Sequence, residues 1–181
     1  MSTGIGIAGL GWMGENEAEI LSEMDTVTLV GVADIDEERR ASFESSYEAH
    51  AFESVEELVT VDQIDAIVVA TPHSYHLEHA VLAMQNGLDV LIEKPMVTSV
   101  SEAEELTKVT EETESLVQIG YYRSFHPVFR EIRRLLETNR IGNPRMVTAN
   151  LGQSWLELNQ GTWRTNRTVV EGVQVFDRGD H

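Results

Sequence analysis

The sequence predicts an α/β protein with a doubly wound parallel sheet. Apolar segments alternate with helical patterns along most of the chain, which is the order of elements that a parallel sheet needs. Several of the apolar segments, such as 66–70, are continuously apolar, as expected for parallel strands that helices cover on both faces. These two observations imply right-handed crossovers between neighbouring strands. A glycine-rich turn after the first strand is a third observation that predicts this fold class.

The elements follow in order from the amino terminus. The expected strands are 4–9, 27–33, 65–70, 88–92 and 115–121. The expected helices are 12–24, 36–48, a short one near 54–60, 74–86, 99–114 and 125–139. Ser54 with Glu57, and Ser99 with Glu102, have the spacing of a capping box at a helix start. Gly87 stands after a helix, where a left-handed C-cap is expected.

Gly9, Gly11 and Gly14 follow the first strand with the spacing of a dinucleotide-binding turn. The first glycine allows a tight turn, the second lets a pyrophosphate approach the backbone, and the third lets helix pack on strand. The helix after the turn would direct its free N–H groups at the pyrophosphate. Trp12 and Met13 open that helix, and we count them with the cofactor-binding residues, with packing as their alternative role.

Asp34 ends the second strand, twenty residues after Gly14. A carboxylate there can accept hydrogen bonds from both ribose hydroxyls of NAD, and it would repel the extra phosphate of NADP. The sequence therefore predicts a Rossmann-type fold that binds NAD. NADP stays as the alternative cofactor because Arg39 and Arg40 lie close to Asp34 in the sequence.

The pattern changes after about residue 142, so we divide the chain in two. Residues 1–122 are expected to form the NAD(P)-binding domain, and residues 123–181 a linking helix with only the start of a second, α+β domain. Residues 146–151 indicate a strand that opens this second domain, whereas 153–168 is polar and has no clear period.

Composition excludes several classes of protein. The 181 residues are 41 % hydrophobic and include no cysteine, which excludes disulfide scaffolds, thiolate metal sites and thiol catalysis. The amino terminus lacks a signal-peptide pattern, and no apolar run has the length of about 20 residues that a membrane span needs. We therefore expect a cytoplasmic protein with no membrane partner.

The chain is very acidic, with 31 acidic against 13 basic residues and a net charge of −18. Such a field repels phosphate backbones, so nucleic acid is not an expected partner. The acids are spread along the chain rather than gathered in a tail, which favours a halophilic, solvated surface over a docking surface for a cationic partner.

Two further groups carry candidate chemistry. Lys94 follows the strand 88–92 at the carboxyl edge, where doubly wound sheets bind ligands, and it is one of only two lysines. We expect it beside the nicotinamide, with an ordinary exposed lysine as the alternative, and Pro95 would fix the backbone after it, by its ring or by a cis bond. Asp177 and His181 are four residues apart, and a histidine oriented by a carboxylate is suited to general acid–base catalysis.

Together these motifs resemble the Gfo/Idh/MocA-type NAD(P)-dependent oxidoreductases, and the resemblance covers the whole chain. The motifs are the glycine turn, Ala33-Asp34-Ile35-Asp36, Ala70-Thr71-Pro72, Glu93-Lys94-Pro95, Gly120-Tyr121-Tyr122-Arg123 and Asp177-Arg178-Gly179-Asp180-His181. The resemblance implies hydride transfer between a carbinol carbon of a sugar, inositol or related polyol and the nicotinamide ring. It does not identify the substrate or the direction of the reaction.

The resemblance also implies a role for each matching residue. Lys94 would hold the reacting hydroxyl, His181 would take or return its proton, and Asp177 would orient the substrate and the base. The residues expected to bind the cofactor are Gly9, Gly11, Trp12, Met13, Gly14, Asp34, Thr71, Pro72, His76, Glu93 and Lys94. No metal is expected, because His73, His76 and His79 do not share one helix face and no carboxylate cluster joins them.

Three features depart from the family pattern. Glu171-Gly172-Val173 stands where relatives have a short glycine run, and Glu17 stands where they often have histidine. The chain ends at His181, whereas relatives continue into an antiparallel sheet that completes the pocket and usually forms the oligomer interface. The alternative function is therefore a truncated, inactive nucleotide-binding module, which could form a homo-oligomer or pair with a full-length relative.

Overall fold

The computed structural model describes residues 2–148, 150, 160 and 161. Contacts divide the chain into two compact units, residues 1–120 and 121–181, and each unit is described by itself.

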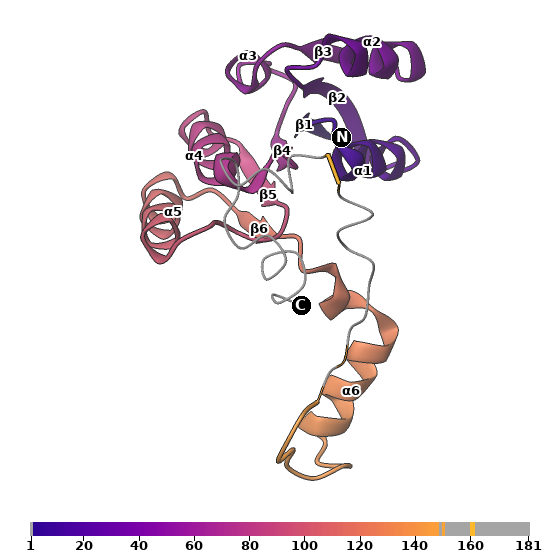
Figure 1. Cartoon of the computed structure of the whole chain (residues 1–181), viewed down its shortest axis with the longest axis vertical. Coiled ribbons are helices and arrows are strands. Elements are labelled where there is room, and N and C mark those ends of the chain that lie inside the picture. Colours follow the sequence, from indigo (N-terminus) through magenta and orange to yellow (C-terminus); the bar gives the residue numbers. More distant parts are fainter. Residues whose placement is uncertain (1, 149, 151–159, 162–181) are drawn as a thin grey trace. The chain divides into compact units, whose positions relative to one another are not determined.

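A six-stranded parallel sheet forms the centre of the first unit (Figure 1). Its strands are β1 (Thr3–Ala8), β2 (Val27–Ala33), β3 (His50–Phe52), β4 (Ala66–Val69), β5 (Asp89–Ile92) and β6 (Val117–Ile119). Their order in the sheet is β3-β2-β1-β4-β5-β6, and each neighbouring pair is parallel. The strands run outward from β1 in both directions, so the predicted doubly wound α/β fold is confirmed.

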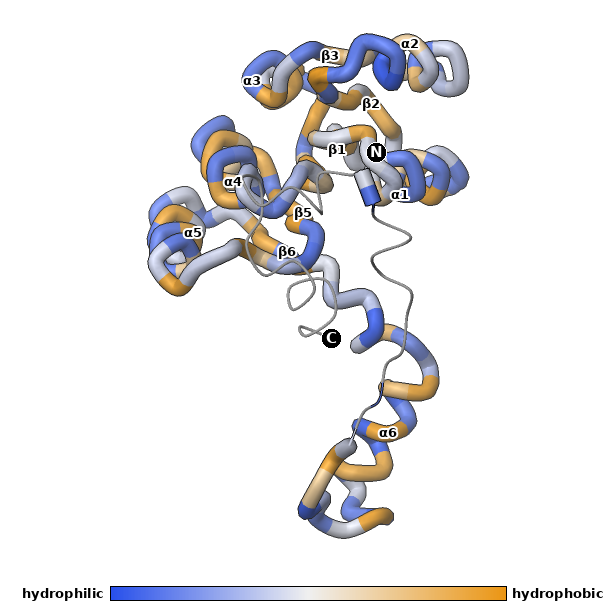
Figure 2. Tube along the Cα trace, viewed as in Figure 1, coloured by the Kyte–Doolittle hydropathy of each residue, from blue (hydrophilic) through white to orange (hydrophobic). Residues whose placement is uncertain are grey.

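Helices connect the strands, as expected for a parallel sheet. They are α1 (Trp12–Ser22), α2 (Glu37–Ser46), α3 (Val55–Leu58), α4 (His76–Gln85) and α5 (Val100–Thr113), with a short 3-10 turn η1 (His73–Tyr75) before α4. Figure 2 shows α2, α4 and α5 with hydrophobic and hydrophilic residues mixed along their turns. Such helices bury one face and leave the other to solvent.

Two apolar cores cover the two faces of the sheet. On one face Ile7, Val32 and Val68 belong to a cluster with Ala18 of α1 and Phe43 of α2. On the other, the cluster combines strand residues with the helices α3, α4 and α5, and includes Leu58, Ile67, Val69, Met84 and Leu106. Successive residues of β4 thus enter different cores, which explains why the strand is continuously apolar.

Most predicted elements agree with the structure to within a few residues, and the exceptions are local. The strand β3 is not among the predicted elements, because three residues are too few to show a period. The predicted start of helix 74–86 is replaced by η1, so α4 begins at His76. The capping box of Ser99 and Glu102 is confirmed in both directions, and Gly87 has the expected positive φ of 79°.

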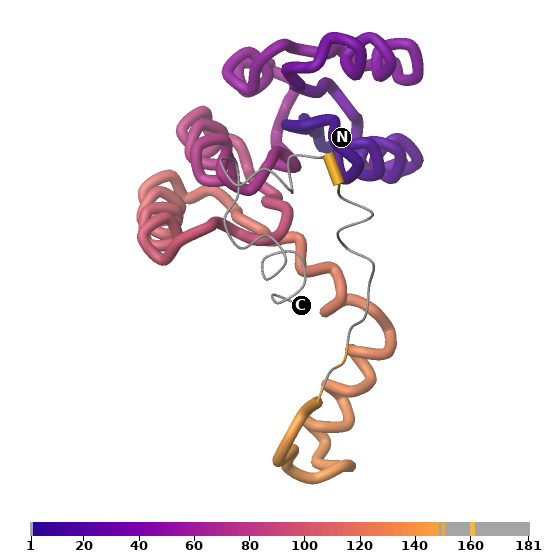
Figure 3. Tube along the Cα trace, viewed as in Figure 1, coloured from indigo at the N-terminus to yellow at the C-terminus, as the bar shows by residue number. Residues whose placement is uncertain are grey.

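The described part of the second unit contains the 3-10 turn η2 (Tyr122–Phe125) and α6 (Pro127–Glu137), which Figure 3 traces along the chain. Residues 146–148 and 150 have no regular secondary structure, so the predicted strand 146–151 is wrong for them. Met146 and Val147 are largely exposed, and a strand needs a hydrogen-bonded neighbour, which they do not have among the described residues. Of the helices described, none has the length and apolar character for crossing a bilayer.

Candidate functional site

Four adjacent strands end at loops that carry predicted site residues. In the order of the sheet, β2 leads to Asp34, β1 to the glycine turn, β4 to Thr71 and β5 to Lys94. Because all four strands are parallel, their carboxyl ends lie on one edge of the sheet. The fold therefore gathers residues that are up to 85 positions apart in the sequence onto one edge.

The three glycines of the turn differ in what surrounds them. Gly9 has a φ of 95°, and a Cβ atom there would lie 3.0 Å from the backbone of Ala70 and Thr71. A Cβ on Gly14 would lie 1.8 Å from the carbonyl oxygen of Gly9. A Cβ on Gly11 would meet no atom within 4 Å. The apoprotein thus needs glycine at two of the positions, whereas the space beside Gly11 is open for a ligand.

Asp34 joins the loop after β2 to the glycine turn. Its Oδ2 accepts a hydrogen bond from the Leu10 N–H at 2.6 Å, and its Oδ1 accepts one from the Asp36 N–H at 2.9 Å. The side chain is 8 % exposed, with the Arg39 Nη1 atom 3.8 Å from Oδ2. Each carboxylate oxygen can accept a second hydrogen bond, so the side chain can still receive ribose hydroxyls.

Glu93 and Lys94 occupy the end of β5. The Glu93 N–H donates to the Val69 carbonyl at 2.9 Å, the Lys94 N–H donates to Glu93 Oε2 at 3.3 Å, and the Lys94–Pro95 peptide bond is cis. Glu93 is only 6 % exposed. Burial raises the pKa of Glu93, as does the negative charge of Glu17, while the Lys94 N–H and the Lys94 charge lower it.

Glu17 therefore influences the pKa of a residue of the site, Glu93. Burial raises the pKa of its own carboxyl group as well. The sequence offered no signal for this proximity, because Glu17 belongs to α1 and Glu93 follows β5. The negative charge of Glu17 makes ionisation of Glu93 less favourable. Glu93 directly precedes Lys94, which is half-buried.

Thr71 and His76 lie where β4 ends. The Thr71 hydroxyl is 3.0 Å from His79 Nδ1. His76 is 1 % exposed, and both of its ring nitrogens contact backbone carbonyls, so it lies beneath the protein surface. The expectation that His76 borders the cofactor cleft stays a prediction. In the part of the chain that the structure describes, no group of three or more metal-ligating side chains is close enough to hold a metal ion.

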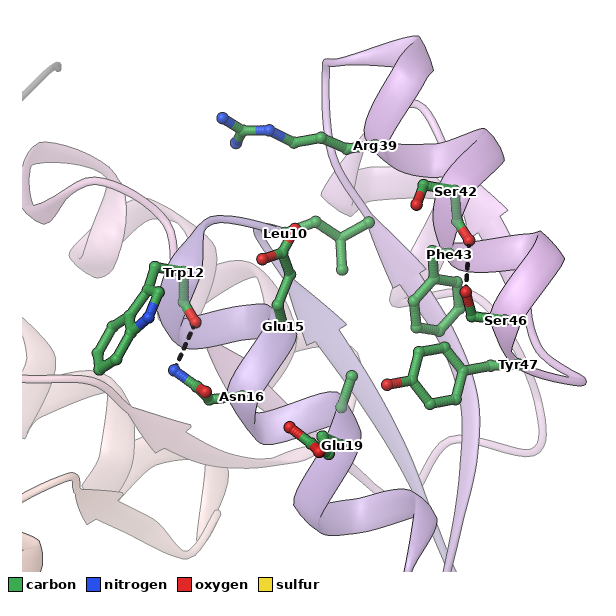
Figure 4. Close-up of a pocket in the computed structure, with 11 residues that line it drawn as sticks. Leu10, Trp12, Glu15, Asn16, Glu19, Arg39, Ser42, Phe43, Ser46 and Tyr47 are labelled. Carbon is green, nitrogen blue, oxygen red and sulfur yellow. Dashed lines mark hydrogen bonds between the residues drawn. The ribbon is translucent and has the colours of Figure 1, made fainter. Parts of the chain in front are cut away.

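A pocket of about 340 Å³ lies beside the glycine turn, between α1 and α2 (Figure 4). Two of the residues that line the pocket are Leu10, in the glycine turn, and Trp12, at the start of α1. Trp12 is 71 % exposed. Phe43 and Tyr47 form the α2 side, with ring centroids 4.8 Å apart. Sequence reasoning missed these two aromatics, although their spacing of four residues on one helix indicates a shared face.

The remaining predicted residues fall into two groups. Pro72 stands on the carboxyl edge after Thr71, and Met13 follows Trp12 at the start of α1. Asp177 and His181 lie outside the described residues, as does the segment 171–173, so their roles stay predictions.

The fold and this edge define a class of protein: one with a Rossmann-type doubly wound sheet. Residues 3–121 match the Gfo/Idh/MocA family model, which is described as an oxidoreductase family with an NAD-binding Rossmann fold. The chain belongs to the Gfo/Idh/MocA family of oxidoreductases.

The sequences of known relatives align with most of this chain. The glucose-6-phosphate 3-dehydrogenase of Bacillus subtilis is 31 % identical over 161 residues, which are 88 % of this chain and 45 % of the relative. The scyllo-inositol 2-dehydrogenase (NADP(+)) IolU of the same organism is 30 % identical over 148 residues, which are 81 % of this chain and 44 % of the relative. The chain thus spans less than half the length of these two relatives.

Solved structures share the fold. The scyllo-inositol dehydrogenase of Lactobacillus casei, crystallised with NAD(H) and scyllo-inositol, matches with a TM-score of 0.76 and 24 % identity. The match covers 79 % of this chain and 43 % of that one.

Proposed function

We propose that the chain belongs to an NAD(P)-dependent dehydrogenase that oxidises or reduces a sugar or polyol. The observation that carries the proposal is the joint placement of the glycine turn, Asp34 and Lys94 on one edge of the sheet. When bound, the nicotinamide cofactor supplies the hydride acceptor or donor. The named substrates of the two relatives, a sugar phosphate and an inositol, support a hydroxylated substrate.

The glycine turn fits the pyrophosphate of the cofactor. Gly11 is the N-cap of α1, it has no side chain to cap the helix, and α1 has 11 residues. The N–H groups of the first turn are therefore available to an anion, and the empty space beside Gly11 allows close approach. An anion in such a position gains about 0.3–2 kcal/mol from the helix dipole.

Lys94 would act on the substrate in two ways. Its ammonium group donates a hydrogen bond to the reacting oxygen, and its charge stabilises the negative charge that develops when the hydroxyl proton leaves. In the direction of oxidation, the O–H proton of the substrate would go to a base, and the bound cofactor would supply the acceptor for the hydride that leaves the carbinol carbon. His181 is the proposed base and Asp177 its orienting partner.

NADH should bind more tightly than NADPH, by about tenfold or about 1.4 kcal/mol. The 2′-phosphate of NADPH would approach the charged Asp34, which is held in place by two backbone N–H groups. Competing titrations with both nucleotides would measure the ratio of the NADPH and NADH dissociation constants. Asp34→Asn keeps an acceptor for the Leu10 N–H and should bring this ratio closer to one. Arg39→Ala should weaken the binding of NADPH more than the binding of NADH. Tighter binding of NADPH by the unmodified chain would contradict this preference.

Cofactor binding is tested by titrating the chain with NADH in about 1 M potassium chloride, a concentration at which charge repulsion is screened. Exposed Trp12 lies beside the turn and should transfer energy to the nicotinamide. Gly11→Val should abolish saturable binding and leave the unfolding temperature unchanged, because its Cβ meets nothing in the apoprotein. Ala41→Val, on the exposed side of α2, adds similar bulk and should bind normally.

A second candidate function is a nucleotide-binding module that needs another chain for turnover. The segment Glu171-Gly172-Val173, which stands where relatives have a short glycine run, favours it. A panel of sugars and polyols with NAD distinguishes the candidates: turnover by the purified chain rejects the second, and binding without turnover rejects the first for this chain alone.

A further inference from the structure

His76 contacts both the loop that carries the proposed catalytic lysine and the neighbouring loop after β4. The Glu93 N–H donates to Val69 O, which is a backbone link between the ends of β4 and β5. Farther along the same two loops, the imidazole of His76 lies between Thr71 and Pro95. Its Nδ1 is 2.8 Å from Pro95 O and its Nε2 is 2.9 Å from Thr71 O. One buried side chain at the start of α4 thus touches both loops.

The proton count of this arrangement is constrained. A backbone carbonyl only accepts hydrogen bonds, and a neutral imidazole has a single N–H. Burial lowers the pKa of His76, and the charge of Lys94 lowers it further, against the raising effect of the carbonyls of Pro95, Thr71 and Met96. His73 approaches the ring edge-on with centroids 5.6 Å apart. A neutral ring can therefore donate to only one carbonyl, and the Pro95 contact is the shorter and the more deeply buried of the two.

We propose that His76 is a positioning residue for Lys94, acting through an Nδ1–H hydrogen bond to the carbonyl of Pro95. This bond joins the residue that directly follows Lys94 to the start of α4, the helix that carries His76. The neutral ring has no second N–H for the Thr71 carbonyl, which only lies in contact with Nε2. His76 thereby sets where Lys94 stands relative to the start of α4. The inference rests on the proposed function, in which Lys94 acts on the substrate.

The lysine content makes a direct test feasible. The chain has two lysines, Lys94 and Lys108, and Lys108 is a surface residue of α5 paired with Glu112 at 3.7 Å. Reductive methylation with 13C-formaldehyde gives each lysine its own NMR signal, and Lys108 serves as the internal reference. Neither cofactor nor turnover is needed, so failure of the proposed dehydrogenase function would not obscure the result.

Three variants separate positioning from general packing. His76→Leu removes the donor and should move the Lys94 signal toward the position of an unrestrained lysine, with Lys108 unchanged. His76→Asn places an amide N–H where Nδ1–H stood and should restore the Lys94 signal. His79→Asn is the matched control, because the His79 ring bonds to the Thr71 hydroxyl instead of bridging two loop carbonyls, and it should leave Lys94 unaffected. An unchanged Lys94 signal in folded His76→Leu would overturn the proposal.

The tautomer of His76 provides a second measurement that requires no variant. 15N spectra of the imidazole should show a proton on Nδ1 at neutral pH, and the ring should protonate only below the ordinary histidine pKa of about 6.5. A proton on Nε2 instead would mean that Pro95 receives no hydrogen bond, and would refute the proposal even if His76→Leu did not fold.

Discussion

Replacing Gly14 with alanine is expected to destabilise the first unit by about 3 kcal/mol or more, a large part of the stability of a typical domain. The added Cβ would lie 1.8 Å from the carbonyl oxygen of Gly9 and 2.9 Å from its carbon. Neither atom can retreat easily, because the backbone at Gly9 is itself packed against Ala70 and Thr71. The helix α1 would have to move away from β1, with loss of contacts in the core that includes Ala18.

Urea unfolding followed by circular dichroism, in molar potassium chloride, measures this loss. Gly11→Ala is the matched control, since its Cβ meets nothing within 4 Å and its φ of −71° suits alanine. It should change stability by less than about 1 kcal/mol. Equal stability of the two variants would show that the close approach of α1 to the turn does not limit the residue at 14.

Lowering the salt concentration is expected to destabilise the first unit. Residues 1–120 contain 25 acidic and 4 basic side chains, a net charge of −21, whereas residues 121–150 contain six arginines against two glutamates. Repulsion among exposed charges is screened within about 10 Å at 0.1 M salt and about 3 Å at 1 M. We propose that the surface is adapted to high salt, and expect the unfolding temperature to rise by about 10 °C, or about 3 kcal/mol, over that range.

A potassium chloride series measures this rise, with sucrose at matched osmolality as the uncharged control. Substituting Glu104, Glu105 and Glu111 with glutamine removes three exposed charges from α5 and should flatten the dependence on salt. The adaptation would be rejected by an unfolding temperature that does not change with potassium chloride.

Local sequence patterns predicted the framework because its determinants are local. Strands apolar on both faces and helices with capping boxes can be recognised within about ten residues. The strand β3 has three residues and no period, and it exists because β2 offers it a neighbour. The error at 146–148 has the same cause in reverse, since an apolar segment becomes a strand only where another strand accepts its hydrogen bonds.

The site was predictable where motifs mark it, and not where tertiary contacts create it. The turn glycines, Asp34 and Lys94 carry motif spacing. The burial of His76, the charge of Glu17 near Glu93, and the pocket formed by Phe43 and Tyr47 depend on which helices lie beside which strands. The sequence pattern of a single segment does not show which residues of other segments lie near it in the fold. Asp177 and His181 remain predictions from the motif alone.

The carboxylate of Asp34 has a consequence for the thermodynamics of cofactor binding. Because its two oxygens already hold the N–H groups of Leu10 and Asp36 in the apoprotein, the loops after β1 and β2 are fastened together before any nucleotide arrives. The conformational entropy of this segment is lost during folding, so nucleotide binding does not bear the free-energy cost of ordering it. We therefore expect affinity at this point to reflect contacts with the nucleotide more than the ordering of a loop.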